Sequence, residues 1–257
     1  MGYARAVLSR PYIFTIIFLV ANLFIFLLMW ESSGMKSAVL WTGFPEEVLL
    51  AYGAKMNYWI RHEHQWWRFV TPVFIHVNLP HVLINMYSLW VIGPWAEKLY
   101  GSAKFVVFWI LTGIAGVVAS YLMVIPGANP GLIGSFLIKS EDVPSAGASG
   151  ALFGLVGVLF VFGIKYRREL PEGFKRAFGT GMLPVILLNL GIGFLGRGFI
   201  DNAAHMGGLL SGAALASMVS YKRPGVSTGM TIAWRVAQIA ALVLVLVCFV
   251  MVARHFG

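Results

Sequence analysis

Residues 13–30 read IFTIIFLVANLFIFLLMW, an apolar run without a single charged side chain. A helix needs about 20 mostly apolar residues to cross the roughly 30 Å hydrocarbon core of a bilayer. The run is longer than the apolar centre of a secretory signal peptide, and the Glu-Ser-Ser-Gly of residues 31–34 does not form the usual small-residue cleavage site. We therefore expect a retained membrane span here.

The composition of the whole chain agrees with this first run. Hydrophobic residues make up 59% of the 257 positions and charged residues 11%, against about a quarter charged in an ordinary soluble domain. The sequence therefore predicts an all-α, polytopic membrane protein with one domain over residues 1–257. Its seven expected spans lie near Ile13–Trp30, His81–Trp95, Phe105–Ile125, Ala146–Gly163, Thr180–Phe194, Ala203–Tyr221 and Ile232–Ala253.

The formal charge of +9 is distributed unevenly over the connecting segments. If the N-terminus is cytoplasmic, twelve of the nineteen cations lie on the inner side, and seven of the ten acids lie on the outer side. The positive-inside rule favours that orientation. The cations form no basic stripe, so no nucleic-acid partner is expected. The lack of a long presequence favours a bacterial inner membrane.

Several special chemistries are disfavoured by single residues. Cys248 is the only cysteine, which excludes a disulfide framework, a zinc–thiolate site and, in practice, a thiol protease. Ala6 stands where a myristoylation motif needs Ser or Thr. Residues 62–64 read His-Glu-His, but a zinc protease helix would need a second His at Trp66. We expect neither a metal nor another cofactor.

The longest segment outside the spans, Gly34–Pro80, is rich in aromatic residues. Trp and Tyr favour the membrane interface, and long loops in compact proteins are often functional. We expect this loop to lie against the outer leaflet, and an ordinary interfacial belt of aromatic residues is an equal alternative.

Polar residues inside the predicted spans form one small set, namely His81, Asn85, Ser149 and His205. Such residues are costly in a bilayer unless they have partners or a wet cavity. Ser149 follows the small residues of the 144–148 segment, Pro-Ser-Ala-Gly-Ala, so nothing bulky shields its hydroxyl. A lone serine here would more often be a packing residue, and it needs a base to become a nucleophile.

His205 is the expected base. It shares a helix face with Gly208 and Gly212, and glycines allow close approach of a second helix. Gly150 and Gly154 provide the same on the span of Ser149. Both polar residues are expected a few positions inside the outer end of a helix, so they match in depth. Asp201, four residues before His205, either orients the imidazole or sits at the helix start.

His81 and Asn85 are four residues apart on the second expected span, so their side chains share a face. They could donate hydrogen bonds to an oxyanion. Taken alone, each has a structural reading, with Asn85 bonding across helices and His81 marking a helix start after Pro80.

The chain resembles the rhomboid family of intramembrane serine proteases from about Trp66 to Tyr221. The family's Gly-x-Ser-Gly reads Gly147–Gly150, Ala-His-x-x-Gly reads Ala204–Gly208, Trp-Arg reads Trp67-Arg68, and His-x-x-x-Asn reads His81–Asn85. The resemblance implies a catalytic dyad of Ser149 and His205, with an oxyanion hole made by His81, Asn85 and the Ser149 amide. It also gives structural roles to His76 and to the Glu-x-x-x-Gly of Glu97–Gly101.

Two departures from the family pattern bear on the site. Phe153 stands where the residue that stacks on the catalytic histidine is often Tyr, and it can still stack. Residues 232–253 add a seventh span to a six-helix rhomboid core at about 12–221. Gly147, Gly150, Phe153 and Gly208 are the expected supporting residues of the site.

The resemblance implies an intramembrane serine endopeptidase that cleaves single-span transmembrane proteins near the outer face of the bilayer. Membrane lipids are the other expected partners, and the sequence does not fix an oligomeric state. One alternative is an inactive rhomboid-like protein that binds membrane clients, although the presence of Ser149 and His205 disfavours it. The second is a transporter or channel, which the apolar mid-span positions disfavour.

Overall fold

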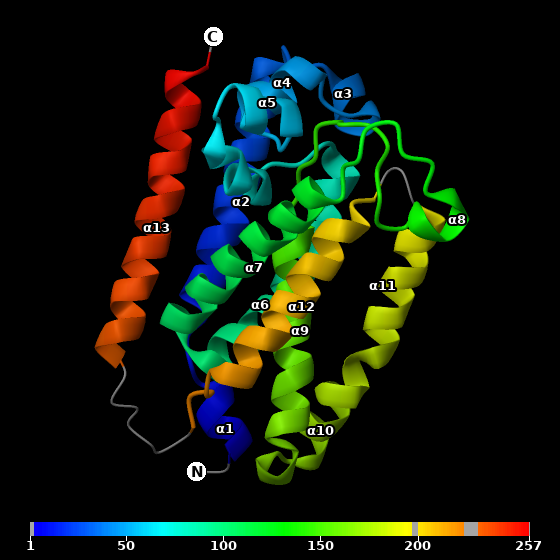
Figure 1. The fold of residues 1–257 in the computed structure, drawn as a ribbon. Helices are drawn as coiled ribbons and strands as arrows, with labels where there is room; N and C mark the ends of the chain where they lie inside the picture. The colour runs from blue at the N-terminus through cyan, green and yellow to red at the C-terminus, as the bar shows by residue number, and fades with distance from the viewer. Residues whose placement is uncertain (1–2, 197–199, 224–230, 257) are drawn as a thin grey trace.

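The computed structural model describes residues 3–196, 200–223 and 231–256, and they form a bundle of helices (Figure 1). Among these residues, β-type pairing is limited to two isolated bridges, Lys55 with Ser145 and Val124 with Lys139. The α-helices are α1 (Tyr3–Leu8), α2 (Ile13–Ser32), α3 (Ser37–Thr42), α4 (Glu46–Ala51), α5 (Asn57–His62), α6 (Leu79–Tyr100), α7 (Ser102–Leu122), α8 (Gly131–Gly134), α9 (Ser149–Lys165), α10 (Glu172–Ala177), α11 (Leu183–Leu195), α12 (Asn202–Met218) and α13 (Thr231–Arg254). Short 3₁₀ helices are η1 (Trp66–Phe69), η2 (Thr71–Phe74), η3 (Arg167–Glu169) and η4 (Gly179–Met182).

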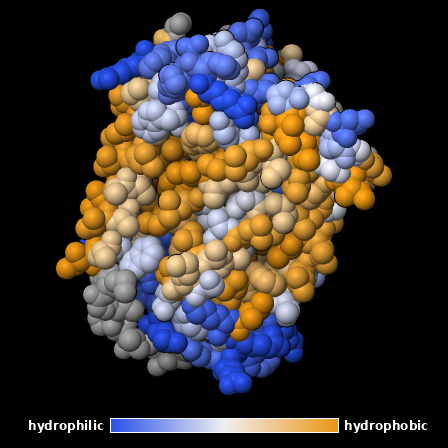
Figure 2. Space-filling model, in the orientation of Figure 1, coloured by the Kyte–Doolittle hydropathy of each residue, from blue (hydrophilic) through white to orange (hydrophobic). Residues whose placement is uncertain are grey.

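Seven long helices, α2, α6, α7, α9, α11, α12 and α13, occupy the seven expected spans. Among the described residues, α2, α7 and residues 232–254 are long and apolar enough to cross a membrane by length and composition, while α9 and residues 179–195 are shorter apolar helices. The visible surface is an apolar belt between two hydrophilic ends (Figure 2). The all-α, polytopic membrane fold is therefore confirmed.

The two ends of the bundle differ in what they carry. Residues 33–78, with α3, α4 and α5, and the segment 123–148, with α8, lie together at one end, which we call the loop end (Figure 1). The N-terminus lies at the opposite end, here the N-terminal end, together with α10. Trp41, Tyr58 and Trp66 are largely exposed on the loop end, whereas Trp67 is buried. The aromatic residues of this loop therefore divide between surface and core.

Helix α9 packs tightly against α7 and α12 because glycines line the contacts. Gly154 lies against the side chain of Thr112 on α7. A Cβ atom on Gly208 would overlap the carbonyl oxygen of Gly150, and one on Gly212 would overlap that of Gly154. Backbone therefore touches backbone along the α9–α12 contact, as the small-residue pattern predicts for membrane helices.

Arg68 holds the loop end together. Its side chain is 5% exposed, and its guanidinium donates to Gln65 Oε1 at 2.6 Å, to the Ala54 carbonyl at 2.7 Å and to the Leu50 carbonyl at 2.9 Å. A planar guanidinium can satisfy several acceptors at fixed angles. This contact explains why an arginine follows Trp67 in a loop that lacks long elements of its own.

Glu97 joins three helices at the N-terminal end. Its carboxylate is 1% exposed and accepts from the backbone N–H groups of Phe14 and Thr15, from the Thr15 hydroxyl and from the Ser102 hydroxyl, at 2.7–3.0 Å. The first two bonds satisfy free donors at the start of α2, where the helix dipole favours an anion. The structural role expected for Glu97 fits these contacts.

Glu97→Ala should lower the free energy of unfolding by about 2 kcal/mol, because four donors lose a charged acceptor. Thermal or denaturant unfolding of the purified protein in detergent measures this. Glu172→Ala is the matched control, since that exposed carboxylate pairs with Lys175 three residues away, and it should change stability little. Equal stabilities of the two variants would contradict the role given to Glu97.

The seventh span, α13, packs on α7 and on the short helices η1 and η2. Trp234 lies edge-on to Phe108 of α7, and Trp67 of η1 lies 4.6 Å from the His255 ring. In Figure 1, α13 stands at the edge of the bundle opposite α11. The added helix therefore covers the side of the core formed by α7 and the short helices η1 and η2.

Candidate active site

Ser149 is the first residue of α9, so the helix begins three residues later than the sequence predicts. Ser145 instead makes an extended pair with Lys55, with N–O distances of 2.8 and 2.9 Å. Gly147 then adopts a φ of +138° and donates its N–H to the Pro72 carbonyl at 2.9 Å. Because this positive φ favours glycine, the chain turns at Gly147 and enters the helix at Ser149. The expectation that Ser149 lies a few positions inside its helix is thus wrong, because Ser149 is the first helical residue.

His205 lies in the first turn of α12 and faces Ser149. Its Nε2 atom is 2.9 Å from the Ser149 Oγ atom. Both residues are partly exposed, so the pair is not sealed from solvent. The Nδ1 atom of His205 is buried, without a hydrogen-bond partner among the described residues. For Nε2 to accept the serine proton, the ring proton resides on Nδ1.

Phe153 supports the imidazole from one side. It lies on α9 one turn after Ser149, and its ring stacks on the His205 ring with a centroid distance of 4.2 Å and an interplanar angle of 12°. Stacking at this distance limits rotation of the imidazole about its side-chain bonds. A phenyl ring thus occupies the stacking position without adding a hydroxyl to the site.

His81 and Asn85 border the turn that precedes Ser149. A Cβ atom on Gly147 would lie 2.7 Å from His81 Nε2 and 3.8 Å from Asn85 Nδ2. The Asn85 amide also donates to the His81 carbonyl at 3.1 Å, which fixes its orientation on α6. The structure therefore brings all four polar residues of the predicted set to one place at the loop end, on three different helices.

His76 forms a second layer behind this turn. It is completely buried, and its Nε2 accepts from the Ala148 N–H at 3.4 Å, while its ring meets the His81 ring edge-to-face at 5.1 Å. Burial, followed by the proximity of His81, lowers the pKa of His76 well below its ordinary value. A neutral ring can accept from an amide, so His76 fixes the residue that precedes Ser149.

Asp201 joins the helix of His205 to the loop of Ser149, a link that the sequence does not reveal. Its Oδ1 atom caps α12 by accepting from the Ala204 N–H at 3.1 Å. Its Oδ2 atom accepts from the hydroxyls of Ser120 and Ser145, each at 2.6 Å, and lies 3.3 Å from the Lys139 ammonium. Burial alone would raise the pKa of Asp201, but Lys139 and these hydrogen bonds outweigh it and lower the pKa to about 2.

The family model of the Rhomboid domain matches residues 63–222 of the chain. This range includes Ser149, His205, His81, Asn85, His76, Phe153 and Asp201. The chain belongs to the rhomboid family. The match covers α6 to α12 together with the end of the preceding loop, whereas α2 and α13 lie outside it.

Individual relatives agree with this membership. Rhomboid protease GluP of Bacillus subtilis (strain 168) is 32% identical over 82% of this chain and 36% of its own length. RHOMBOID-like proteins 2 and 5 of Arabidopsis thaliana are 34% and 35% identical, over 60% and 58% of this chain and 42% and 43% of their own lengths. The matches therefore span less than half of each of these relatives.

Lys55 adds a buried cation to the loop end of this rhomboid. Its side chain is 1% exposed and lies 3.9 Å from Asp142, whose carboxylate accepts from the Asn57 and Tyr58 N–H groups at the start of α5. Burial lowers the pKa of Lys55 from 10.5 to about 8, although Asp201 and Asp142 oppose the shift. The folded chain therefore holds this proton less tightly than the unfolded chain does.

A pH-dependent stability difference follows from Lys55. Between about pH 8 and pH 10.5 the unfolded state binds more protons at this residue, so stability rises with pH there. The wild type should gain roughly 3 kcal/mol relative to Lys55→Met over this range. Unfolding of both proteins in one detergent at several pH values measures the difference between their free energies of unfolding. The contributions of the other lysines are the same in both proteins and cancel in this difference. Parallel curves would contradict the inference.

Proposed function

We propose that this rhomboid is an intramembrane serine endopeptidase in which Ser149 is the nucleophile and His205 the general base. The observation that carries the proposal is the 2.9 Å contact between Ser149 Oγ and His205 Nε2. A serine hydroxyl is a weak nucleophile until an adjacent base accepts its proton. Both residues lie at the loop end of spanning helices, so the reaction takes place near one face of the membrane.

The reaction divides into acylation and deacylation. Ser149 Oγ attacks the scissile carbonyl carbon while its proton moves to His205 Nε2, and the tetrahedral intermediate collapses as that proton passes to the leaving amine. Water then attacks the acyl carbon and gives a proton to His205, and as the bond to Ser149 Oγ breaks that proton returns to Oγ, which releases the carboxylic acid product. Because the pair is partly exposed, water can reach it.

The negative charge that develops on the carbonyl oxygen is stabilised by His81, Asn85 and the Ser149 N–H. His81 and Asn85 lie beside Gly147, and Ser149 provides the first N–H of α9, where the helix dipole favours an anion. Donors fixed before the reaction stabilise the transition state without reorganisation. Gly147 lets the His81 ring approach the turn before Ser149, and Gly150 and Gly208 let α9 and α12 approach each other closely.

Asp201 is a positioning residue rather than a third member of a triad. Its two oxygens are occupied by Ala204, Ser120, Ser145 and Lys139. These bonds tie the first turn of α12 to the segment that enters α9, and so hold the distance between Ser149 and His205. The role does not require a proton on Asp201.

The substrates are transmembrane proteins, by analogy with the family, and single-span helices that unwind near the loop end fit the position of the site. The charge distribution supports a cytoplasmic N-terminus, since the segments at the N-terminal end carry twelve cations and three acids. The site then faces the outer side, and a bacterial inner membrane is the proposed location.

A serine-reactive fluorophosphonate tests the proposal directly. The purified full chain in detergent should form an adduct on Ser149, located by peptide mass spectrometry, and His205→Ala should slow labelling by at least about 100-fold because the general base is lost. An adduct on another residue, or equal labelling without His205, would overturn the assignment. A wild type that neither labels nor cleaves but binds a membrane client would favour the inactive rhomboid-like alternative.

A further inference from the structure

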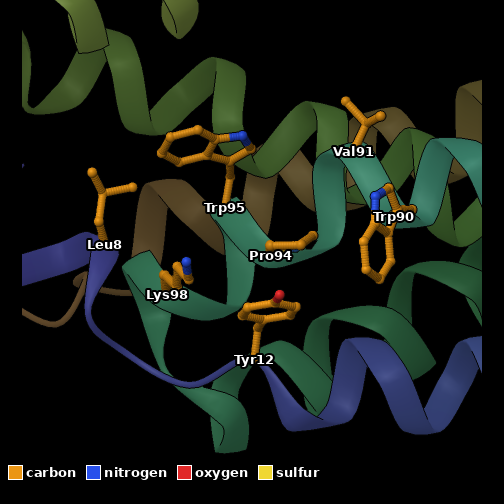
Figure 3. Close-up of a pocket in the computed structure, with 7 residues that line it drawn as sticks. All are labelled: Leu8, Tyr12, Trp90, Val91, Pro94, Trp95 and Lys98. Atoms are coloured by element: carbon orange, nitrogen blue, oxygen red, sulfur yellow. The ribbon is translucent and has the colours of Figure 1, made fainter.

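A pocket at the N-terminal end lies far from the residues of the proposed active site. It opens between the beginning of α2 and the second half of α6, with a volume of about 220 Å³. Leu8 and Lys98 lie towards one side and Trp90 and Val91 towards the other, with Tyr12 and Pro94 between them and Trp95 above (Figure 3). The pocket is smaller than the roughly 300–1,000 Å³ that enclose a whole small molecule, so a larger ligand would extend beyond it.

The polar side of the pocket presents a cation that lacks a carboxylate partner. The Lys98 ammonium lies 4.8 Å from the centre of the Tyr12 ring, and within the described ranges no acid lies within ion-pair distance of it. The neighbouring Glu97 turns inward and is fully used by α2 and Ser102. Lys98 therefore keeps its charge available to an anion.

A second cation is held beside Lys98 by the backbone. The Arg10 guanidinium donates to the carbonyls of Lys98 and Lys222, each at 2.8 Å. By sequence, the segments at this end carry twelve cations and three acids. Their net charge of +9 equals the formal net charge of the whole chain. The surroundings of the pocket therefore attract negative charge, and they face the membrane surface where lipid head groups lie.

The apolar side continues along the exposed face of α6. Leu83, Ile84, Tyr87, Trp90 and Val91 are 45–71% exposed and share one face by their spacing. Pro94 has no N–H, so the carbonyl of Trp90 lacks its usual helix hydrogen-bond donor four residues on. An apolar strip that ends at an aromatic rim and a cation matches the shape of an amphiphile.

We propose that this pocket binds an anionic phospholipid, with its phosphate on Lys98 and one acyl chain along the exposed face of α6. The charge decides in favour of an anionic lipid over a zwitterionic one, because the Lys98 ammonium lines the pocket and none of the described lining residues carries a carboxylate. The apolar lining decides in favour of a lipid over free phosphate, because the lining residues other than Lys98 are apolar or aromatic and can hold an acyl chain. The inference does not depend on the proposed peptidase, since it concerns the other end of the bundle.

Native mass spectrometry of the purified full chain tests the proposal, with phosphatidylglycerol and phosphatidylcholine of identical chains as probes. The wild type should retain phosphatidylglycerol in preference, and Lys98→Ala should weaken its retention about five-fold, the contribution of one cation near a membrane surface. Lys98→Arg keeps the charge and should retain the lipid. Lys175→Ala is the matched control at the same end, because its ammonium already pairs with Glu172 at 2.6 Å, and it should bind like the wild type.

The outcomes separate the possible ligands. The proposal would be overturned if the wild type retained both lipids equally. It would also be overturned if Lys98→Ala retained phosphatidylglycerol as well as the wild type does. Glycerol phosphate that competes as well as the intact lipid would point to a free phosphate site and also overturn it. Thermal unfolding of each variant in detergent, compared with the wild type, shows that the proteins are folded, and peptidase activity plays no part in the readout.

Discussion

Ser149→Ala is expected to reduce cleavage of a transmembrane substrate by at least about 10⁴-fold. The substitution removes the hydroxyl oxygen that lies 2.9 Å from His205 Nε2. Without it no acyl-enzyme forms, and water would have to attack the carbonyl directly. His205→Ala should produce a loss of the same order, because nucleophile and base act as one unit.

Cleavage of a purified single-span model substrate in detergent, followed by mass spectrometry of both fragments, measures this effect. Ser88→Ala is the matched control, since Ser88 is a partly exposed residue of α6 whose hydroxyl donates to the Ile84 carbonyl of its own helix. It should cleave like the wild type. The double variant of Ser149 and His205 should be no worse than either single variant. Undiminished cleavage by Ser149→Ala would remove the nucleophile from the proposal.

The sequence predicts the helical scaffold because hydrophobicity alone defines a membrane span. Each expected span contains a long helix, and glycine spacing indicated that α9 and α12 touch through Gly150, Gly154, Gly208 and Gly212. Helix ends were less predictable. Small residues before Ser149 suit a membrane helix as well as a turn, and only the pairing of Ser145 with Lys55 and the φ of Gly147 decide between them.

The contacts that hold the candidate site in place could not be derived from pattern. Asp201 is recognisable as a helix cap, and the structure places it there. Its other partners, Ser120, Ser145 and Lys139, come from the end of one helix and from a loop without periodicity. Hydrophobic spacing fixes the face of a helix but carries no information on how an irregular loop folds back. The burial of Lys55 beside Asp142 could not be predicted for the same reason.

Asp201→Ala is expected to lower kcat by about 100-fold while changing KM little. The carboxylate links the α12 helix of His205 to the loop of Ser149, and a displacement of about 1 Å between catalytic groups costs on this order. The free energy of unfolding should also fall by about 2–3 kcal/mol. The reason is that the pKa of Asp201 is about 2 in the folded protein, against its ordinary value of 3.8 in the unfolded chain. This contribution is present above pH 4 and disappears as the pH falls through 2.

The measurement separates a positioning role from a purely structural one. Rates of fluorophosphonate labelling and of substrate cleavage are expressed per folded molecule, below the unfolding temperature of each variant. Asp201→Asn keeps an acceptor for the Ala204 N–H but loses the charge that holds Lys139, and it should recover part of the rate. Glu141→Gln, an exposed acid of the same loop, should behave like the wild type. If Asp201→Ala loses stability while folded molecules react at the wild-type rate, Asp201 supports the fold and the dyad is positioned by α9–α12 packing alone.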